Sequence, residues 1–235
     1  MIVRFKPRLD ILPQAQRALW PHLTPLRPLG WVLYGGTAIA LRLGHRRSDD
    51  FDFFHAAPLD RHSLHEALPW LSRATVLQDG INTFSVELKG APAAGVKLSF
   101  FGQITFGRIG LPALTSDGVM HAASTADLLA TKLKVILQRV EAKDYRDIAA
   151  LLRARAGLAR GLSGARLLFG TPFQPSESLK AMAYFEGGDL DELNAADRRT
   201  LLAAIRRVGP LPIVTLASRT LGPDTLPSRP YRMIR

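Results

Sequence analysis

The sequence of 235 residues contains no cysteine. This absence excludes disulfide bonds, thiolate zinc sites and a cysteine nucleophile, and it fits the reducing cytoplasm, where we expect the protein to act. Long apolar runs are also missing, because no stretch approaches the roughly 18 consecutive apolar residues that span a membrane. The first residues lack the apolar core of a signal peptide. We therefore expect no membrane partner.

Acidic residues are in the minority, since 20 Asp and Glu stand against 31 Lys and Arg and the net charge is +11. This excess indicates a polyanionic partner, of which nucleic acid is the first candidate and an anionic membrane the less favoured one. A basic protein without such a partner explains the charge equally well. The hydrophobic content of 47% and the charged content of 22% are typical of a globular protein.

The most informative stretch runs from residue 34 to residue 54. Residues 31–34 are aromatic or aliphatic and predict a strand that stops at a Gly-Gly pair. Residues 37–43 predict a short helix that ends at Gly44. Residues 50–54 predict a second strand, on which Asp50 and Asp52 share one face while Phe51 and Phe53 turn into the core.

Two neighbouring carboxylates repel each other unless a cation lies between them. Mg²⁺ or Mn²⁺ suits Asp50 and Asp52, because hard divalent ions prefer oxygen ligands and share their shell with phosphates. Gly35 and Gly36 let a phosphate approach the backbone at the start of the helix, and Thr37 adds a hydroxyl. Alone, a Gly-Gly pair is usually a turn and an Asp-x-Asp a solvated strand end. Their order and spacing favour a site for a nucleoside triphosphate (NTP) and a metal.

The same stretch resembles a known motif. Gly35-Gly36-Thr37, a short helix and His45-Arg46-x-Ser48-x-Asp50-x-Asp52 are similar to the first motif of nucleotidyltransferase toxins of the AbiEii/AbiGii type, within the polymerase-β-like superfamily. The resemblance implies that Asp50 and Asp52 hold the metal. It further implies that the nucleotide is bound by Gly35, Gly36, Thr37, Arg46 and Ser48.

A second match to this family begins after residue 124, where the apolar residues start to recur at helical spacing. The family motif there is a Lys, a spacer to an Arg, then Lys/Arg-Asp-x-x-Asp-Leu. The residues that match it are Lys132, Arg139, Lys143, Asp144 and Asp147, with Ile148 where leucine is more usual. If one helix continues through the segment, the spacing places Lys132, Arg139, Lys143 and Asp147 near one face.

A triphosphate under in-line attack needs cations on its oxygens as charge moves to the leaving pyrophosphate. We expect Lys132 to make that contact, with Arg139 and Lys143 binding the nucleotide. Asp147 either orients Lys132 or acts as the general base. The alternative is a solvated helix face with an ion pair between Lys143 and Asp147.

The third carboxylate that many polymerase-β-like transferases carry on a later strand is missing. The matching strand is 95–101, and Ser99 stands at the expected position. Glu87 on the preceding strand is a possible substitute. The identity of the base therefore stays open.

The predicted fold is α+β, with a nucleotidyltransferase-like mixed or antiparallel sheet flanked by helices. The β-runs at 73–77, 83–89 and 96–101 predict an antiparallel extension of that sheet. We expect a core over residues 1–120 and a helical C-terminal domain over 121–235 that contributes Lys132 and Asp147. The pairs at 198–199 and 206–207 are candidates for RNA phosphate contacts or a solvated face, and the tail, 220–235, is expected to be extended or partly ordered.

The resemblance implies an Mg²⁺-dependent enzyme that moves a nucleoside monophosphate from an NTP to an acceptor hydroxyl, with RNA such as the tRNA 3′ end as acceptor. It also implies the toxin of a toxin–antitoxin pair or of a phage abortive-infection system, with an antitoxin as partner. Two alternatives stay open. One is a degenerate, non-catalytic fold that binds RNA or protein. The other is a small-molecule nucleotidyltransferase, for which a basic surface disfavours cationic aminoglycosides.

Overall fold

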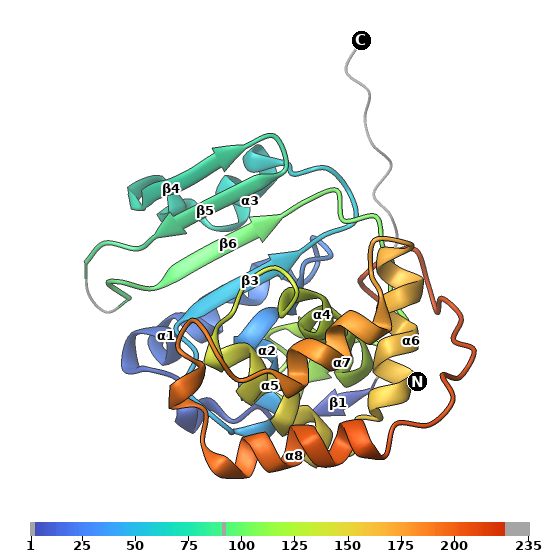
Figure 1. Cartoon of the computed structure of the whole chain (residues 1–235). Helices are drawn as coiled ribbons and strands as arrows, with labels where there is room; N and C mark the ends of the chain where they lie inside the picture. The colour runs from blue at the N-terminus through green and yellow to red at the C-terminus, as the bar shows by residue number, and fades with distance from the viewer. Residues whose placement is uncertain (1–2, 91–92, 224–235) are drawn as a thin grey trace.

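The computed structural model describes residues 3–90 and 93–223. In this part of the chain a mixed, eight-stranded sheet has the order β1-β7-β8-β2-β3-β6-β5-β4. The strands are β1 (Arg4–Phe5), β2 (Val32–Tyr34), β3 (Asp50–Phe54), β4 (Thr75–Gly80), β5 (Thr83–Glu87), β6 (Lys97–Phe101), β7 (Ala113–Thr115) and β8 (His121–Ala122). Helices flank the sheet, and the predicted α+β class is confirmed (Figure 1).

The α-helices are α1 (Gln14–Leu19), α2 (Gly35–Leu43), α3 (Arg61–Ala67), α4 (Thr125–Val135), α5 (Ala142–Arg153), α6 (Leu158–Phe169), α7 (Pro175–Ala183) and α8 (Ala195–Arg206). The 3-10 helices are η1 (Leu9–Ile11), η2 (Trp20–Leu26), η3 (Pro69–Arg73) and η4 (Leu190–Glu192). Figure 1 shows β4, β5 and β6 stacked at one side of the molecule, whereas α5 to α8 gather at the other. Among the described residues, no helix has the length and apolar character needed to cross a membrane.

Strand β3 lies at the centre of the sheet and has two different neighbours. It pairs antiparallel with β2, so that Asp52 lies opposite Tyr34, and parallel with β6, so that Asp52 lies beside Ser99. Strands β6, β5 and β4 follow as antiparallel neighbours, which confirms the predicted extension. The period-two pattern of β3 is also confirmed, because Phe51 and Phe53 are fully buried while the two aspartates stay partly exposed.

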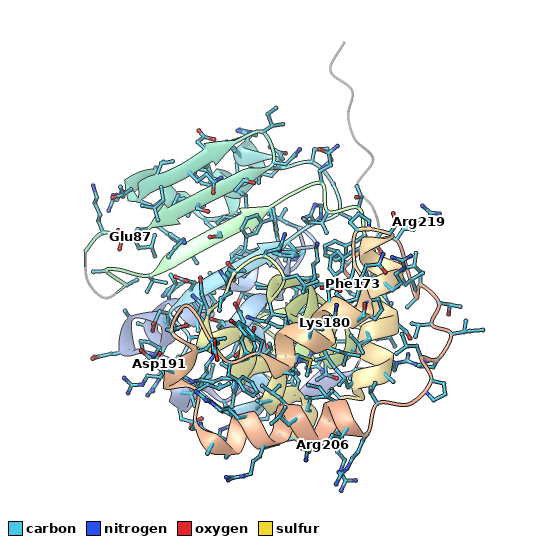
Figure 2. The ribbon with its side chains drawn as sticks, in the orientation of Figure 1. Glu87, Phe173, Lys180, Asp191, Arg206 and Arg219 are labelled. Atoms are coloured by element: carbon cyan, nitrogen blue, oxygen red, sulfur yellow. The ribbon has the colours of Figure 1, made fainter. Side chains whose placement is uncertain are left out.

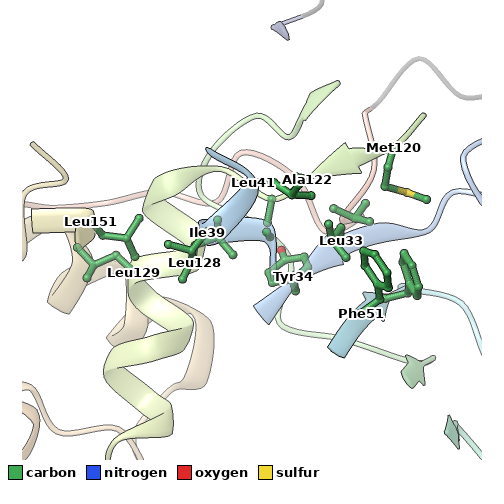
Figure 3. Packing of buried hydrophobic residues seen from close by; sticks show 14 of the residues in the cluster. Leu33, Tyr34, Ile39, Leu41, Phe51, Met120, Ala122, Leu128, Leu129 and Leu151 are labelled. Carbon is green, nitrogen blue, oxygen red and sulfur yellow. The ribbon is translucent and has the colours of Figure 1, made fainter. Parts of the chain in front are cut away.

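The core below β3 is aromatic. The ring centroids of Phe53 and Phe100 are 5.2 Å apart, and Trp20 of η2 stacks on Phe51 at 6.0 Å. On the helical side, residues of β2, α2, α4 and α5 meet in the same hydrophobic cluster, as Leu33 and Leu128 illustrate (Figure 3). This packing holds the aspartate-bearing face of β3 rigidly toward solvent.

The common face of Lys132, Arg139, Lys143 and Asp147 depended on one helix continuing through the segment after residue 124, and this condition is not met. Helix α4 ends at Val135 and a separate helix, α5, begins at Ala142, so the predicted common face does not exist. The start of α5 is capped from a distant loop, because the Ala142 amide donates to Asp189 Oδ1 at 2.6 Å. A carboxylate at a helix N-terminus satisfies a free N–H and favours a new helix start. The chain therefore turns back, and α5 packs beside α4.

The expected division at residue 120 stays a prediction. Strand β8 belongs to the sheet although it lies just beyond that position, and α2 packs against both α4 and α5. The segment before residue 224 is anchored by Arg108, whose backbone bridges to Ser218. Most of the tail predicted at 220–235 lies outside the described residues.

Replacing Phe53 by alanine is expected to lower the free energy of unfolding by roughly 3–5 kcal/mol, because the change leaves a cavity beside Phe51 and Phe100. Urea unfolding followed by circular dichroism measures the change. The control is Ile81→Ala, since Ile81 is 88% exposed. Equal effects of the two substitutions would contradict the placement of Phe53 in the core.

Candidate active site

A pocket of about 470 Å³ opens between the polar face of the sheet and helix α4 with the turn that follows it. Most residues that the sequence singled out meet there although they come from four separate segments. Those that line the pocket are Gly35, Gly36, Arg46, Ser48, Asp50, Asp52, Lys132, Arg139 and Lys143. Thr37 and Asp147 lie behind its wall.

Asp50 and Asp52 stand on the same face of β3, as predicted. Burial raises the pKa of Asp52, and the negative charge of Asp50 raises it further, whereas Lys132 and Lys97 act in the opposite direction. Two neighbouring carboxylates of this kind could serve as oxygen ligands for a hard divalent cation. No group of three or more His, Asp or Glu in the described chain is arranged to hold a metal. A cation here would take two protein ligands and complete its shell from water or substrate.

The structure explains why positions 35 and 36 are glycine, which the sequence did not reveal. Gly35 has a φ of +70°, and the carboxyl group of Asp52 lies where a side chain at this position would point. The guanidinium of Arg46 occupies the corresponding space at Gly36. The pair therefore lets a carboxylate and a cation close onto the first turn of α2.

Thr37 is not among the residues that line the pocket, and its role in binding the nucleotide stays a prediction. Its side chain is buried, donates to the backbone carbonyl of Asp50 and lies 2.9 Å from Ser48 Oγ. These contacts tie α2 to the beginning of β3. Thr37 thus fixes the two halves of the motif relative to each other, and only Ser48 of this pair reaches the pocket wall.

Lys132 is held between two buried carboxylates. Its Nζ lies 2.6 Å from Asp144 Oδ1 and 2.6 Å from Asp147 Oδ2. Arg139, at the pocket rim, donates to the same Asp144 at 2.8 Å. Burial alone raises the pKa of Asp144, but Arg139 and Lys132 outweigh this effect and hold the pKa below its usual range.

Asp147 is the most heavily engaged carboxylate of the site. Arg46 binds it with two hydrogen bonds of 2.6 and 2.8 Å, and His45 Nε2 lies 2.7 Å from Oδ1. Burial raises the pKa of Asp147, yet Lys132, His45 and Arg46 together hold it well below its usual range. Its geometry favours orienting Lys132 and Arg46 over acting as a base. The ion pair considered between Lys143 and Asp147 is not formed, because Lys143 pairs with Glu141 at 2.7 Å.

No carboxylate replaces the third acid on the neighbouring strands. Ser99 lies beside Asp52 in the sheet register, and its hydroxyl is 3.0 Å from that of Ser85 on β5. Glu87 is exposed at the end of β5 and lies outside the pocket lining (Figure 2). Two hydroxyl groups therefore form the pocket floor where the superfamily commonly places an acid.

Two residues that contribute to the candidate site were not predicted from the sequence. Lys97 lines the pocket and lies opposite Asp50 in the β3–β6 register. Its position two residues before Ser99, on the same face of the strand, was the available signal. Asp144 had no assigned role, although its spacing of three from Asp147 places both on one side of a helix.

Asp147→Asn is expected to lower the free energy of unfolding at pH 7 by roughly 3–5 kcal/mol, because it leaves Lys132 and Arg46 buried with too little negative charge. The pKa of Asp147 is lowered on folding, so its contribution exists above the unfolded-state value near 3.9 and disappears as the pH falls toward the folded-state value. As the pH is lowered below about 5, the free energy of unfolding should therefore fall less for the variant than for the parent. Urea titrations from pH 3 to 7 measure both effects.

The matched control is Glu177→Gln, which removes a charge from an exposed pair with Lys180. Its expected effect is below about 1 kcal/mol at any pH, as is usual for surface ion pairs. A parallel pH dependence for Asp147→Asn and the parent would count against a structural ion network at this position.

The chain is similar in sequence to known proteins. A family model described as "Nucleotidyl transferase AbiEii toxin, Type IV TA system" matches residues 25–220. The "Uncharacterized protein aq_aa25" of Aquifex aeolicus (strain VF5) is 35% identical over 125 residues, which cover 52% of this chain and 58% of that protein. The match to this relative thus spans less than two thirds of its length. The family match extends from the glycine turn through the helices that carry Lys132 and Asp147, and the chain belongs to the AbiEii nucleotidyl transferase toxin family of type IV toxin–antitoxin systems.

Proposed function

We propose that the protein is a metal-dependent nucleotidyltransferase that moves a nucleoside monophosphate from an NTP to an acceptor hydroxyl on RNA, and that it acts as a toxin. One observation carries the proposal. Asp50 and Asp52 share a pocket with a glycine turn and with the buried ammonium group of Lys132. Metal ligands, a phosphate-binding backbone and a fixed positive charge are the parts that phosphoryl-group transfer requires.

In this proposal Asp50 and Asp52 hold Mg²⁺ or Mn²⁺ between them. When bound there, the ion would offset negative charge on the triphosphate. The first turn of α2 lines the same pocket, and its N–H groups would donate hydrogen bonds to phosphate oxygens, helped by Arg46 and Ser48. Protonation of Asp52 removes one ligand, so its raised pKa matters for binding.

The acceptor oxygen attacks the α-phosphorus, and the bond from that phosphorus to the oxygen bridging to the β-phosphate breaks. Pyrophosphate leaves with the negative charge that develops on this oxygen, while the acceptor proton passes to water. Lys132 is placed to stabilise the leaving group, because Asp144 and Asp147 fix its position before substrate arrives. Arg139 and Lys143 at the rim can add to the same charge.

RNA is the acceptor we favour, and the tRNA 3′ end is the specific candidate. The net charge of +11 supports attraction to a polyanion. The family also supports an antitoxin as a partner of the toxin system. A small-molecule acceptor would use the same chemistry, and labelling of total RNA distinguishes the two.

Asp52→Asn is expected to lower transfer of labelled nucleotide to tRNA by at least about 100-fold, because it removes a ligand at the reaction centre. The same substitution should leave the free energy of unfolding unchanged or raise it, since it relieves repulsion from Asp50. The measurement is incorporation from each α-labelled NTP into total tRNA with Mg²⁺, beside urea unfolding. Absence of labelled product from the parent protein with any NTP or acceptor would sink the proposal.

Binding of Mn²⁺ is expected to weaken as the pH falls, and to do so above the range of an ordinary aspartate near pH 4. The physical reason is that the raised pKa of Asp52 makes a proton compete with the metal earlier. Electron paramagnetic resonance of free Mn²⁺ from pH 4 to 8 gives the affinity. Asp52→Asn serves as the control and should bind weakly throughout. An affinity that stays constant down to pH 4 would speak against Asp52 as a ligand.

The second candidate is a degenerate fold that binds RNA without catalysis, and Ser99 at the third-acid position is the observation that favours it. Calorimetry separates the two functions. Saturable binding of RNA with no heat from Mg-NTP would support the non-catalytic protein, whereas binding of both agrees with the enzyme.

A further inference from the structure

A second groove, of about 510 Å³, lies between the C-terminal end of α5, the N-terminal end of α6 and helix α8. None of its lining residues lines the active-site pocket. The two cavities share helix α5, which carries Asp144 and Asp147 near its start and Leu152 and Arg153 at its end. An occupant of the groove would therefore leave the pocket open.

The floor of the groove is apolar. Leu152, Ala156 and Leu158 form it on the side of α5 and α6. Helix α8 contributes Thr200, Ala203 and Ala204, and its C-cap residue Arg207 continues the same face at a spacing of three. This face of α8 is only partly covered by the rest of the molecule. Small side chains here leave room for another element to pack against it.

The rim of the groove is basic. Two arginines, Arg153 and Arg207, line the groove. Three more, Arg155, Arg160 and Arg206, lie within the segments 152–160 and 200–208 that supply the lining, and these segments contain no acidic residue. Arg153 pairs with Asp197 at 2.7 Å. The other four are exposed, and within the described chain their side chains have no ion pair or hydrogen bond. Figure 2 shows Arg206 directed away from the body of the molecule.

Arg198, nearer the start of α8, behaves differently from these four arginines. Arg198 donates to the carbonyl oxygens of Leu190 and Leu193 and lies over the ring of Phe185, so it braces η4 and is not free for a ligand. Arg206 and Arg207, at the C-terminal end of α8, are exposed beside the groove.

We propose that this groove docks an acidic, amphipathic segment of a partner protein. Apolar side chains of the segment would cover the floor, and its carboxylates would meet the arginine rim. The positive end of the α6 dipole, at Gly157 and Leu158, adds to the same preference for negative charge. RNA fits less well, because no aromatic side chain lines the groove for base stacking. The proposal is independent of the transferase activity.

The test uses the full-length protein and a fluorescein-labelled helical peptide of about 16 residues, with leucine on one face and glutamate on the other. Fluorescence anisotropy should show saturable binding that weakens with salt. The triple variant R155E/R160E/R207E should weaken it at least about tenfold. The control R4E/R73E/R219E carries the same charge change away from the groove, and we expect less than about twofold from it.

Two further probes separate the floor from the rim. A peptide with serine in place of leucine should lose binding, as should one with lysine in place of glutamate. Equal weakening by the two triple variants, or no saturable binding of the acidic peptide, overturns the proposal. So does a result in which R155E/R160E/R207E weakens binding of total tRNA while the acidic peptide fails to compete, since the groove would then be an RNA surface.

Discussion

Lys132 lies with its ammonium group 2.6 Å from a carboxylate oxygen of Asp144 and 2.6 Å from one of Asp147. Neither carboxylate is exposed, and each binds a further cation, Arg139 in one case and Arg46 in the other. The three cations exceed the two anions by one positive charge. Removing either carboxylate would leave the buried site with still more unbalanced positive charge, which is far more costly than losing a surface pair. The network therefore joins α4, α5 and the segment after α2 into one unit.

The site also brings two like charges, on Asp50 and Asp52, close together, and the rest of the fold keeps them there. Asp50 and Asp52 stand side by side on β3, and burial together with their mutual repulsion raises the pKa of Asp52. The aromatic layer of Phe51, Phe53 and Phe100 on the opposite face keeps the strand in place despite this strain. Such an arrangement is unfavourable for stability and useful for binding a cation. It is the pattern expected where a protein gives up stability for function.

Helix α5 contributes to both the buried ion network and the second groove. Its first turns deliver Asp144 and Asp147 to the ion network, and its last turn reaches an apolar groove with an arginine rim. The basic residues that give the net charge of +11 include two groups with different surroundings. Part of it is neutralised by buried carboxylates next to the pocket, and part remains free at the ends of α5, α6 and α8. In the functions proposed above, an RNA acceptor and an acidic protein partner would use different parts of this charge.

The sequence by itself determined the features that depend on local periodicity. Alternation on residues 50–54 placed Asp50 and Asp52 on one face, and the glycine pair marked the turn before α2, since backbone geometry sets both within a few residues. The two motifs also indicated the family, and the strand at 95–101 revealed that Ser99 replaces an acid.

Only the tertiary structure decided how distant segments meet. Arg46 and Asp147 are 101 positions apart, and the cap that starts α5 comes from Asp189, 47 positions after Ala142. Helical spacing could not decide whether one helix continues from α4 to α5, because it contains no information about a cap supplied by a remote loop. Likewise it could not show that Thr37 turns inward to Asp50 or that α5, α6 and α8 enclose a groove. Local sequence sets which face a side chain takes, whereas packing between elements decides which partner it finds there.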